Sequence, residues 1–369
     1  MTLPEPRAAI ASLPAYVPGA RPSGADVSPV KLSSNEVAFA PLPSVREAIA
    51  AAGEFANRYP DMMASEVAEA VAARWSAGAG SLGAVSFGAE SVVVAGGSVA
   101  VLGHTLHAYC DPGDEVVYAW RSFEAYPILA QIAGAASVRV ALGPDARHDL
   151  PAMANAITPR TKVLLLCTPN NPTGPAIRRD EFETLMAIVP RGVVVVLDEA
   201  YAEFVRDPAA VDGRAALADY PNLLVTRTFS KAYGLAGLRL GYAIGAPRLV
   251  APIRACVTPF SVSGVAQAAA LASLAAEEEL LARVDAVVAE RGRVVSRLAE
   301  DGWRVPDAQG NFVWLAAGAQ AGALAAFLQV QTPSILVRPF TGEGVRITVG
   351  SPQENDHVLA ALAAYPDRF

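Results

Sequence analysis

Short apolar runs that alternate with helical patterns through the middle of the chain constrain its fold more than any other feature. The runs are SVVVAGG, DEVVYAW, ASVRVAL, TKVLLLC, GVVVVLDEA and NLLVTRTF. Each is rich in β-branched residues and bounded by Gly, Pro or Asp, as buried strands are. The gaps hold helical patterns such as SVAVLGHTLHAYC and RDEFETLMAIV. This alternation predicts an α/β fold, with a mainly parallel sheet between two layers of helices.

The pattern changes on both sides of this region. Residues 1–40 contain much Pro, Gly and Ser without periodicity, and we interpret them as an extended arm. Residues 41–255 form the predicted large domain. Within 256–369, alanine-rich helices lead into the strand candidates NFVWLAA, SILVRPF and VRITVG. We therefore predict a smaller α+β domain there, to which the arm also belongs.

Composition excludes several classes of protein. A formal net charge of −7 leaves no basic excess for nucleic acid. The longest apolar stretches fall short of the roughly 20 residues that span a bilayer, and the N-terminus has acid and proline where a signal peptide needs a basic start. Three widely spaced cysteines without a CxxC pair indicate reduced thiols. We expect a cytoplasmic protein that binds neither nucleic acid nor a membrane.

Two apparent motifs carry little weight. Gly78, Gly80 and Gly83 match the dinucleotide pattern GxGxxG, but a helix precedes them and a loop follows. The nucleotide-binding motif requires a preceding strand and a following helix. His104 and His107 share a helix face without an acidic or cysteine partner nearby, so we expect no metal site.

Lys231 is one of only three lysines, and it lies in TFSKAYGLAGLRLGY between a strand-like run and a glycine-rich turn. Lysine amines form imines with carbonyls, and carbanion chemistry needs an electron sink of the pyridoxal phosphate type. Such a site requires an imine lysine, an anion site, a carboxylate facing the pyridine nitrogen and a group on the ring hydroxyl. The Ser-Lys pair is also compatible with a serine hydrolase, although no separate oxyanion turn is recognisable.

The other requirements have candidates along the same chain. Gly96, Gly97 and Ser98 lie between a strand and a helix, where free N–H groups and the helix dipole favour a phosphate. Asp198 ends a very apolar strand, at the edge where open α/β sheets bind ligands. A buried carboxylate there needs a cationic partner, and a pyridinium is one. Tyr201, three residues later, is placed to reach the ring hydroxyl.

Three further polar residues are candidates for the same site. Asn171, in LLLCTPNNPTG, follows an apolar strand and is held in extended geometry by the proline after it. An ordinary Asn-Pro turn is an equal interpretation of that segment. Ser230 and Arg239 flank Lys231, and both types of side chain bind phosphate oxygens.

Five blocks, GGSVAVL, TPNNPTG, VVVVLDEAY, TFSKAYGLAGLRLGY and VRITVG, together resemble the fold-type I pyridoxal phosphate aminotransferases in order and spacing. They look most like the histidinol-phosphate aminotransferase branch, and the resemblance covers nearly the whole chain. It implies a large αβα domain, a small domain and pyridoxal 5'-phosphate as the cofactor. It also implies a ping-pong reaction that moves an amino group from an amino acid to a 2-oxo acid such as 2-oxoglutarate.

The resemblance assigns a role to each matched position. Lys231 is implied as the imine-forming and proton-carrying lysine, Asp198 as the partner of the pyridine nitrogen, and Tyr201 as a catalytic ligand of the ring oxygen. The remaining cofactor ligands that it implies are Gly97, Ser98, Phe123, Asn171, Ser230 and Arg239, with Tyr59 reaching the phosphate of a neighbouring subunit. The implied homodimer follows from Tyr59 alone. The positions implied on the substrate side are Tyr16, Asn35, Arg338 and Arg346, of which the last binds the carboxylate.

Two departures from the histidinol-phosphate branch bear on the substrate. Val99 and Ala100 follow Ser98, where that branch commonly has acidic residues, and Arg338 is joined to Arg346 by a shorter linker. Both features resemble actinobacterial relatives called aromatic-amino-acid or phenylalanine aminotransferases. We therefore expect an aromatic donor (phenylalanine, tyrosine or tryptophan), with histidinol phosphate as the alternative.

Two other reactions or roles remain open at this point. A decarboxylase or lyase of the same fold would use the same cofactor residues, because pyridoxal phosphate activates any of three bonds at the α-carbon. A non-catalytic sensor module would need an attached DNA-binding segment, and the N-terminal arm is short and poor in basic residues.

Overall fold

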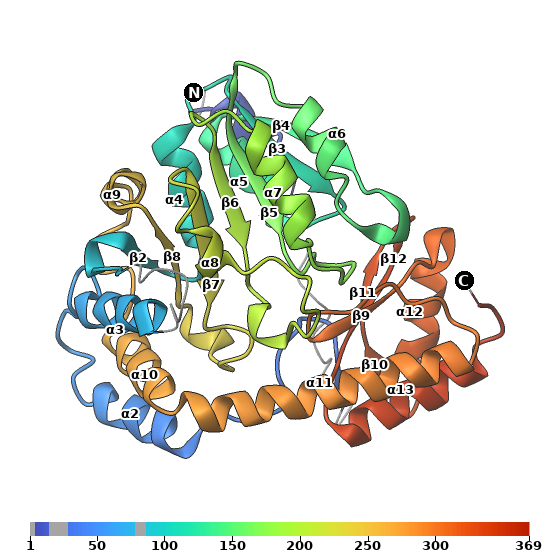
Figure 1. Cartoon of the computed structure of the whole chain (residues 1–369). Helices are drawn as coiled ribbons and strands as arrows, with labels where there is room; N and C mark the ends of the chain where they lie inside the picture. Colours follow the sequence, from blue (N-terminus) through green and yellow to red (C-terminus); the bar gives the residue numbers. More distant parts are fainter. Residues whose placement is uncertain (1–3, 15–28, 78–85, 369) are drawn as a thin grey trace.

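The computed structural model describes residues 4–14, 29–77 and 86–368, and its main feature is a seven-stranded sheet in the order β2-β8-β7-β6-β5-β3-β4 (Figure 1). The strands are β2 (Val92–Ala95), β3 (Glu115–Trp120), β4 (Ala136–Ala141), β5 (Thr161–Cys167), β6 (Val194–Asp198), β7 (Leu223–Thr228) and β8 (Gly241–Gly245). Only β8 runs antiparallel to its neighbours, β2 and β7. The predicted mainly parallel α/β sheet is confirmed, whereas β8 was not predicted.

Helices cover both faces of this sheet (Figure 1). One face packs against α4 (Ser98–Tyr109), α5 (Ala125–Ala133) and α9 (Pro247–Ala255). The other packs against α3 (Ser65–Ala77), α6 (Leu150–Asn155), α7 (Arg179–Ile188), α8 (Gly213–Ala216) and α10 (Gly264–Ala275). Alternate residues of β6 enter the two cores, because side chains point to opposite faces along a strand. This two-sided burial explains the unbroken apolar runs in the sequence.

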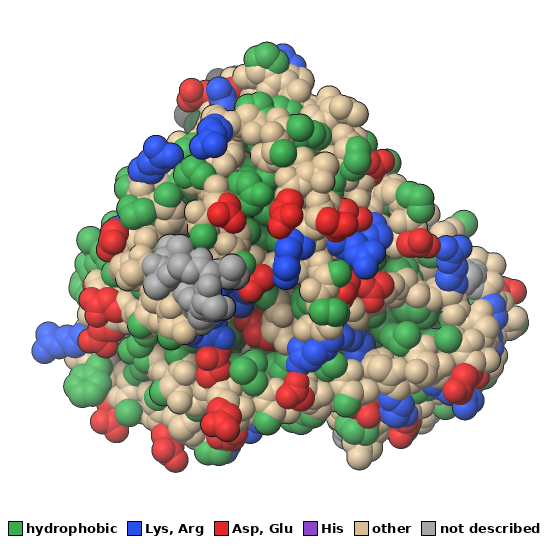
Figure 2. Space-filling model, viewed as in Figure 1, with side chains coloured by type: hydrophobic (Ala, Val, Ile, Leu, Met, Phe, Trp, Pro, Cys, Tyr) green, Lys and Arg blue, Asp and Glu red, His purple; other side chains and the backbone are tan. Residues whose placement is uncertain are grey.

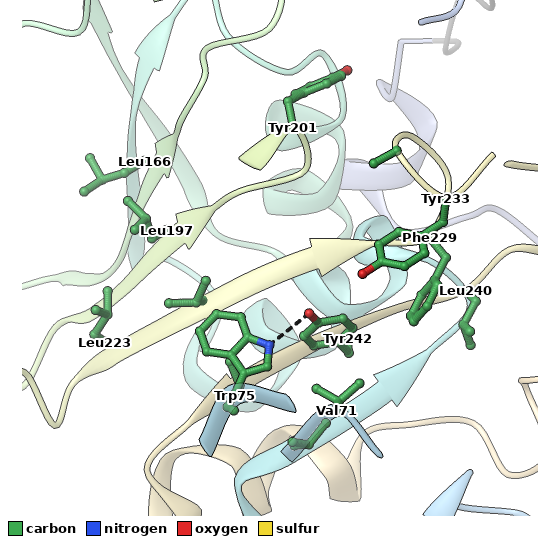
Figure 3. Close-up of a cluster of buried hydrophobic side chains, with 14 of the residues drawn as sticks. Val71, Trp75, Leu166, Leu197, Tyr201, Leu223, Phe229, Tyr233, Leu240 and Tyr242 are labelled. Carbon is green, nitrogen blue, oxygen red and sulfur yellow. Dashed lines mark hydrogen bonds between the residues drawn. The ribbon is translucent and has the colours of Figure 1, made fainter. Parts of the chain in front are cut away.

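Figure 3 shows part of the core between the sheet and α3. Trp75 is 1% exposed, and its indole N–H donates a hydrogen bond to the Tyr242 hydroxyl at 3.0 Å. Both aromatic side chains thus bury large surfaces while their polar tips remain paired. Tyr201 lies at the edge of this cluster, with its hydroxyl pointing away from Trp75 and Tyr242 (Figure 3).

The C-terminal part forms a smaller unit around a three-stranded antiparallel sheet, in the order β11-β12-β9. These strands are β9 (Phe312–Leu315), β11 (Arg338–Phe340) and β12 (Gly344–Thr348), and they pack against α12 (Ala321–Gln329) and α13 (Pro352–Ala364). A separate parallel pair joins β1 (Val30–Lys31) to β10 (Ile335–Leu336). The end of the predicted N-terminal arm therefore lies against the small unit.

The long helix α11 (Glu277–Glu300) connects the two units along the lower edge of the molecule in Figure 1. Its residues Leu280, Val284 and Val287 belong to the core of the large unit, and Val294 and Leu298 belong to that of the small unit. Two more helices, α1 (Ala8–Ala11) and α2 (Pro43–Gly53), lie in the N-terminal part. The packing passes from one core to the other within α11. The predicted domain boundary between residues 255 and 256 stays a prediction. Although α10 follows this boundary in the sequence, it packs in the core of the large unit.

Acidic and basic side chains are interspersed over the face of the molecule that Figure 2 shows. This distribution agrees with a composition in which 36 acidic residues are set against 29 basic ones. Among the helices in residues 4–14, 29–77 and 86–368, none has the length and apolarity required to cross a membrane.

Candidate active site

A cavity of about 280 Å³ lies where the large sheet meets the hairpin of the small unit. Its walls include Cys167, Asp198 and Thr228, the last residues of β5, β6 and β7. Arg338, Phe340 and Arg346, from β11 and β12, also line it. The carboxyl ends of parallel strands form the ligand-binding edge of open α/β sheets. The two units therefore build this cavity together, at the edge that the sequence predicted.

Lys231 lies three residues after the end of β7 and lines the cavity. Its amine donates a hydrogen bond to the Ser34 carbonyl oxygen at 3.1 Å. Burial, followed by the positive charge of Arg346, lowers the pKa of Lys231 to about 7. A large fraction of this amine is therefore neutral near pH 7, which is the form that attacks carbonyls and accepts protons.

Asp198 ends β6 and is 3% exposed. Its carboxylate accepts hydrogen bonds from the Tyr126 hydroxyl at 2.8 Å and from the Thr226 hydroxyl at 3.1 Å. Burial raises the pKa of Asp198, and these two hydrogen bonds oppose that shift. A cation brought against this carboxylate would stabilise its ionised form further.

The N-terminus of α4 and Arg239 form a cradle of hydrogen-bond donors. Gly97, which precedes the helix, has a φ of 92°. This left-handed φ favours glycine, and a Cβ added there would also lie 2.6 Å from Nη2 of Arg239. The Arg239 guanidinium also donates to the Ser230 hydroxyl at 3.2 Å. Helix N–H groups, a hydroxyl and a guanidinium thus converge on one spot, as a phosphate requires.

Tyr201 is held at the edge of the cavity by Asn35. The Asn35 amide donates to the Tyr201 hydroxyl at 2.9 Å and accepts a hydrogen bond from the Thr348 hydroxyl at 3.1 Å. Asn35 is 0% exposed and is absent from the described residues that line the cavity. The resemblance implies Asn35 on the substrate side of the site. In the structure its side chain instead orients Tyr201, which lines the cavity.

Asn171 and Arg346 are in direct contact. The Arg346 guanidinium donates to the Asn171 side-chain oxygen at 2.6 Å and to the Ser33 carbonyl oxygen at 2.8 Å. Both Asn171 and Arg346 line the cavity that holds Lys231. An arginine fixed in this way presents a planar set of donors suited to a carboxylate.

Arg338 lies directly across the β11–β12 ladder from Arg346. Its Nη2 donates to Oε2 of Glu124 at 2.8 Å, and both residues line the cavity. Phe123, the neighbour of Glu124, also lines the cavity and meets Tyr126 edge to face at a centroid distance of 5.6 Å. Arg338 thus reaches the cavity with a carboxylate already bound to it.

One predicted residue lies away from the cavity, and another is not described. Tyr59 is 83% exposed and packs on Phe260, with ring centroids 4.7 Å apart, and is absent from the described lining of this cavity. Tyr16 falls outside the described residues. The sequence analysis also overlooked Glu124, Tyr126 and Thr226. A usable signal existed for Glu124 alone, because it closely follows the end of β3 at the same edge of the sheet.

The sequence of this chain is similar to those of known aminotransferases. The sequence model of the family "Aminotransferase class I and II" matches residues 27–362. An aromatic amino acid aminotransferase of Thermobifida fusca is 49% identical over 98% of this chain and 97% of its own length. One from Streptomyces coelicolor is 48% identical over 97% and 96%.

Solved aminotransferase structures share the fold of this chain. A histidinol-phosphate aminotransferase from Sinorhizobium meliloti, in complex with pyridoxal 5'-phosphate, superposes with a TM-score of 0.81 at 26% identity. That match covers 90% of this chain and 89% of the other. A Thermus thermophilus aspartate aminotransferase shares the fold, with a TM-score of 0.80 at 24% identity, over 98% of this chain and 99% of the other.

Proposed function

Because this chain belongs to the class I and II aminotransferase family, we propose that it transfers the amino group of an aromatic amino acid to a 2-oxo acid. It is a pyridoxal phosphate-dependent aminotransferase, with an amino acid and a 2-oxo acid as substrates. The resemblance found in the sequence is thereby confirmed. The observation that carries the aromatic donor is the 49% identity, over nearly the full length, to a relative named for aromatic amino acids.

The residues of the cavity fit the cofactor. We assign its phosphate to Gly97, Ser98, Ser230 and Arg239, which form the donor cradle beside α4. Gly97 supports this assignment, because a Cβ there would fill the space beside the Arg239 guanidinium. The groups assigned to the ring are Asp198 for its nitrogen, Tyr201 and Asn171 for its oxygen, and Phe123 for its face.

In this proposal the bound cofactor supplies an electron sink for the pair left at the substrate's α-carbon. Lys231 Nζ would take the proton from the α-carbon of the donor and pass it on to the cofactor, and with the 2-oxo acid it would deliver a proton to the new α-carbon; a pKa of about 7 suits both steps. Arg346 binds the α-carboxylate and orients the substrate. The buried Asp198 carboxylate would keep the ring nitrogen of the cofactor protonated and positively charged, so that negative charge developing during the reaction is stabilised.

The two alternative functions, a histidinol-phosphate aminotransferase and a decarboxylase or lyase, would use the same site, but similarity to named relatives supports them less. Histidinol phosphate as the donor rests on structural neighbours at about a quarter sequence identity. A decarboxylase or lyase reaction is named by neither of the two relatives reported above. We therefore assign phenylalanine, tyrosine and tryptophan as donors, with 2-oxoglutarate as a representative acceptor.

We also propose that the protein is a homodimer. Tyr59 is 83% exposed; Phe260, which packs on it, is 42% exposed, and Phe55 and Met62, close to Tyr59 in the sequence, are 67% and 45% exposed. Tyr59 and Phe260 pack on each other, with ring centroids 4.7 Å apart, and exposed apolar surface of this kind often marks an interface. The sequence resemblance implies that Tyr59 of one copy reaches the cofactor phosphate of the other. All three cysteines are free, which supports a reducing cytoplasmic location.

The donor class is tested by steady-state kinetics with 2-oxoglutarate as the acceptor. We expect kcat/KM for phenylalanine to exceed that for histidinol phosphate by about tenfold or more, the size of effect that one pocket contact provides. Lys231→Ala should abolish turnover with both donors. A hundredfold preference for histidinol phosphate, at about 2.7 kcal/mol, would overturn the aromatic assignment. Release of carbon dioxide or ammonia without an acceptor would instead indicate a decarboxylase or lyase.

A further inference from the structure

The proposed reaction requires one cavity to hold two side chains of different charge. The aromatic donor has an uncharged ring, whereas 2-oxoglutarate and the glutamate formed from it carry a second carboxylate. Both kinds of substrate place their α-carboxylate on Arg346 in the proposed function, so their side chains extend into the same part of the cavity. An unpaired cation fixed there would disfavour the ring, and a fixed acid would disfavour the carboxylate. The charge of this wall therefore has to differ between the two half-reactions.

Arg338 is the cation that can meet the second carboxylate. The basic residues among the described lining of the cavity are Lys231, Arg239, Arg338 and Arg346. The other three are already assigned to the reacting carbon, the cofactor phosphate and the α-carboxylate. Arg338 is bound by Glu124, with Nη2 and Oε2 2.8 Å apart. While this ion pair persists, this part of the wall carries no net charge.

Glu124 lies between two guanidinium groups. Its Oε2 accepts a hydrogen bond from Arg338, and its Oε1 lies 4.0 Å from Nη1 of Arg121. Arg121 uses its other two nitrogens, Nε and Nη2, to bind the carboxylate of Glu343. Nη1 is thus the nitrogen that the Glu124 carboxylate can approach. A change of side-chain rotamer in Glu124 would shorten this contact and lengthen the one to Arg338.

The same wall presents aromatic surface to an uncharged side chain. The rings of Phe123 and Phe340 both line the cavity. The guanidinium groups of Arg121 and Arg338 each lie 5.4 Å from the Phe340 ring centroid. An aromatic substrate side chain would meet these rings and the neutral ion pair, and it would leave Glu124 in place.

We propose that Glu124 is a specificity-determining residue that moves between Arg338 and Arg121, and so adapts the cavity to both substrates. This inference rests on the proposed function, with 2-oxoglutarate as the acceptor. With an aromatic side chain bound, Glu124 stays on Arg338. With a distal carboxylate bound, Glu124 turns to Arg121, and Arg338 binds the substrate.

The exchange keeps every carboxylate next to a guanidinium. The distal carboxylate replaces Glu124 on Arg338, and Glu124 gains Nη1 of Arg121, so no acid is left buried without a partner. Arg121 is then shared by Glu124 and Glu343. The added negative charge is tolerated there because the Glu343 side chain is 34% exposed and is solvated.

The binding of two unreactive acids to the cofactor-loaded enzyme tests this exchange. Glutarate carries the second carboxylate, phenylpropionate carries the ring, and neither has an amino or keto group that can react. Dissociation constants are measured by isothermal titration calorimetry. We expect Arg121→Met to weaken glutarate about tenfold or more, because Glu124 loses its second partner, and to change phenylpropionate by less than about twofold.

A double-mutant cycle shows whether Arg121 acts through Glu124. Glu124→Gln removes the charge that has to move, so in this background Arg121→Met should change glutarate affinity by less than about twofold. An equal loss in both backgrounds would overturn the exchange. Glu124→Gln alone leaves Arg338 uncompensated, and it should favour glutarate over phenylpropionate by about fivefold or more relative to the wild type.

Two controls separate this effect from a change in net charge. Arg121→Met combined with Glu343→Gln keeps the net charge of the chain and should retain the loss of glutarate affinity. Recovery of glutarate binding in that variant would contradict the proposal. Arg304→Met removes an arginine from an exposed ion pair with Asp145, outside the described lining of the cavity, and should leave both dissociation constants within about twofold.

The two proposals can fail independently. The proposed function is judged from turnover of phenylalanine with 2-oxoglutarate by the wild type, whereas the role of Glu124 is judged from binding of acids that do not react. If Arg121→Met does not fold, the shift expected for Glu124→Gln still tests the exchange. An unchanged ratio of the two dissociation constants in Glu124→Gln would then overturn it.

Discussion

Replacing Lys231 with methionine should stabilise the cofactor-free protein although it removes the reacting amine. Burial lowers the pKa of Lys231 from 10.5 to about 7. At about 1.4 kcal/mol per pKa unit, holding this ammonium in the cavity costs the folded state roughly 5 kcal/mol below pH 7. Methionine is uncharged and similar in length, but it loses the hydrogen bond to the Ser34 carbonyl, worth about 1 kcal/mol. We therefore expect a net stabilisation of about 3 to 4 kcal/mol at low pH.

The effect has a defined pH dependence. Between about pH 7 and pH 10.5 the unfolded chain keeps the lysine proton while the folded protein has released it. Since the unfolded state then binds more protons, the stability of the wild type rises with pH across this window. The destabilisation by Lys231 is complete below pH 7 and disappears towards pH 10.5. The advantage of the methionine variant should shrink along the same interval.

Urea unfolding of cofactor-free protein, followed by tryptophan fluorescence at pH 6, 7.5, 9 and 10.5, measures this difference. Lys162→Met is the matched control, because its side chain is 40% exposed and lies 3.9 Å from Asp114 near the surface. That substitution should change the free energy of unfolding by less than about 1 kcal/mol. A Lys231→Met difference that stays constant from pH 6 to pH 10.5 would refute the burial argument.

Three further perturbations test other parts of the site. Gly97→Ala places a Cβ 2.6 Å from Arg239 at a φ of 92°; affinity for pyridoxal phosphate, titrated by absorbance, should fall about tenfold or more, and unchanged affinity would count against the cradle. Tyr126→Phe removes a hydrogen bond that lowers the pKa of Asp198, so the acidic limb of the kcat/KM profile should move to higher pH, and an unmoved limb would exclude this link. Tyr59→Asp places a charge on the exposed surface that Tyr59 forms with Phe260, and it should shift sedimentation towards the monomer. An unaltered dimer would place the interface elsewhere.

The parallel strands could be predicted because each is buried on both faces and therefore reads as an unbroken apolar run. The segment of β6, Val194–Asp198, is an example. In contrast, β8 has the sequence GYAIG, with glycine at both ends. A Cβ on Gly241 would overlap the backbone nitrogen of Ser98, so close packing with α4 requires glycine there. That requirement removes the β-branched signal by which strands are recognised.

Some residues of the site could likewise be predicted from the sequence, and others could not. Lys231, Asp198 and Gly97 could be proposed because each lies at a strand end or a βα turn within a recognisable local pattern. Tyr126 lies in an apolar helix segment, and its importance comes from a hydrogen bond to Asp198, 72 residues away in the chain. Glu124 likewise binds Arg338, 214 residues away in the chain. No local pattern encodes such contacts, because the fold alone brings the partners together.

The one antiparallel strand explains how Lys231 and Arg239 come to serve the same cavity. The chain leaves β7 at the carboxyl edge of the sheet, where Lys231 lies, and after the connection 229–240 enters β8 in the opposite direction. Arg239, just before β8, is therefore still at that edge, and the pairing of β8 with β2 carries it beside Gly97. A parallel strand in place of β8 would need a crossover and would begin at the opposite edge of the sheet. The direction of β8, more than the eight-residue spacing, thus brings the guanidinium to the donor cradle.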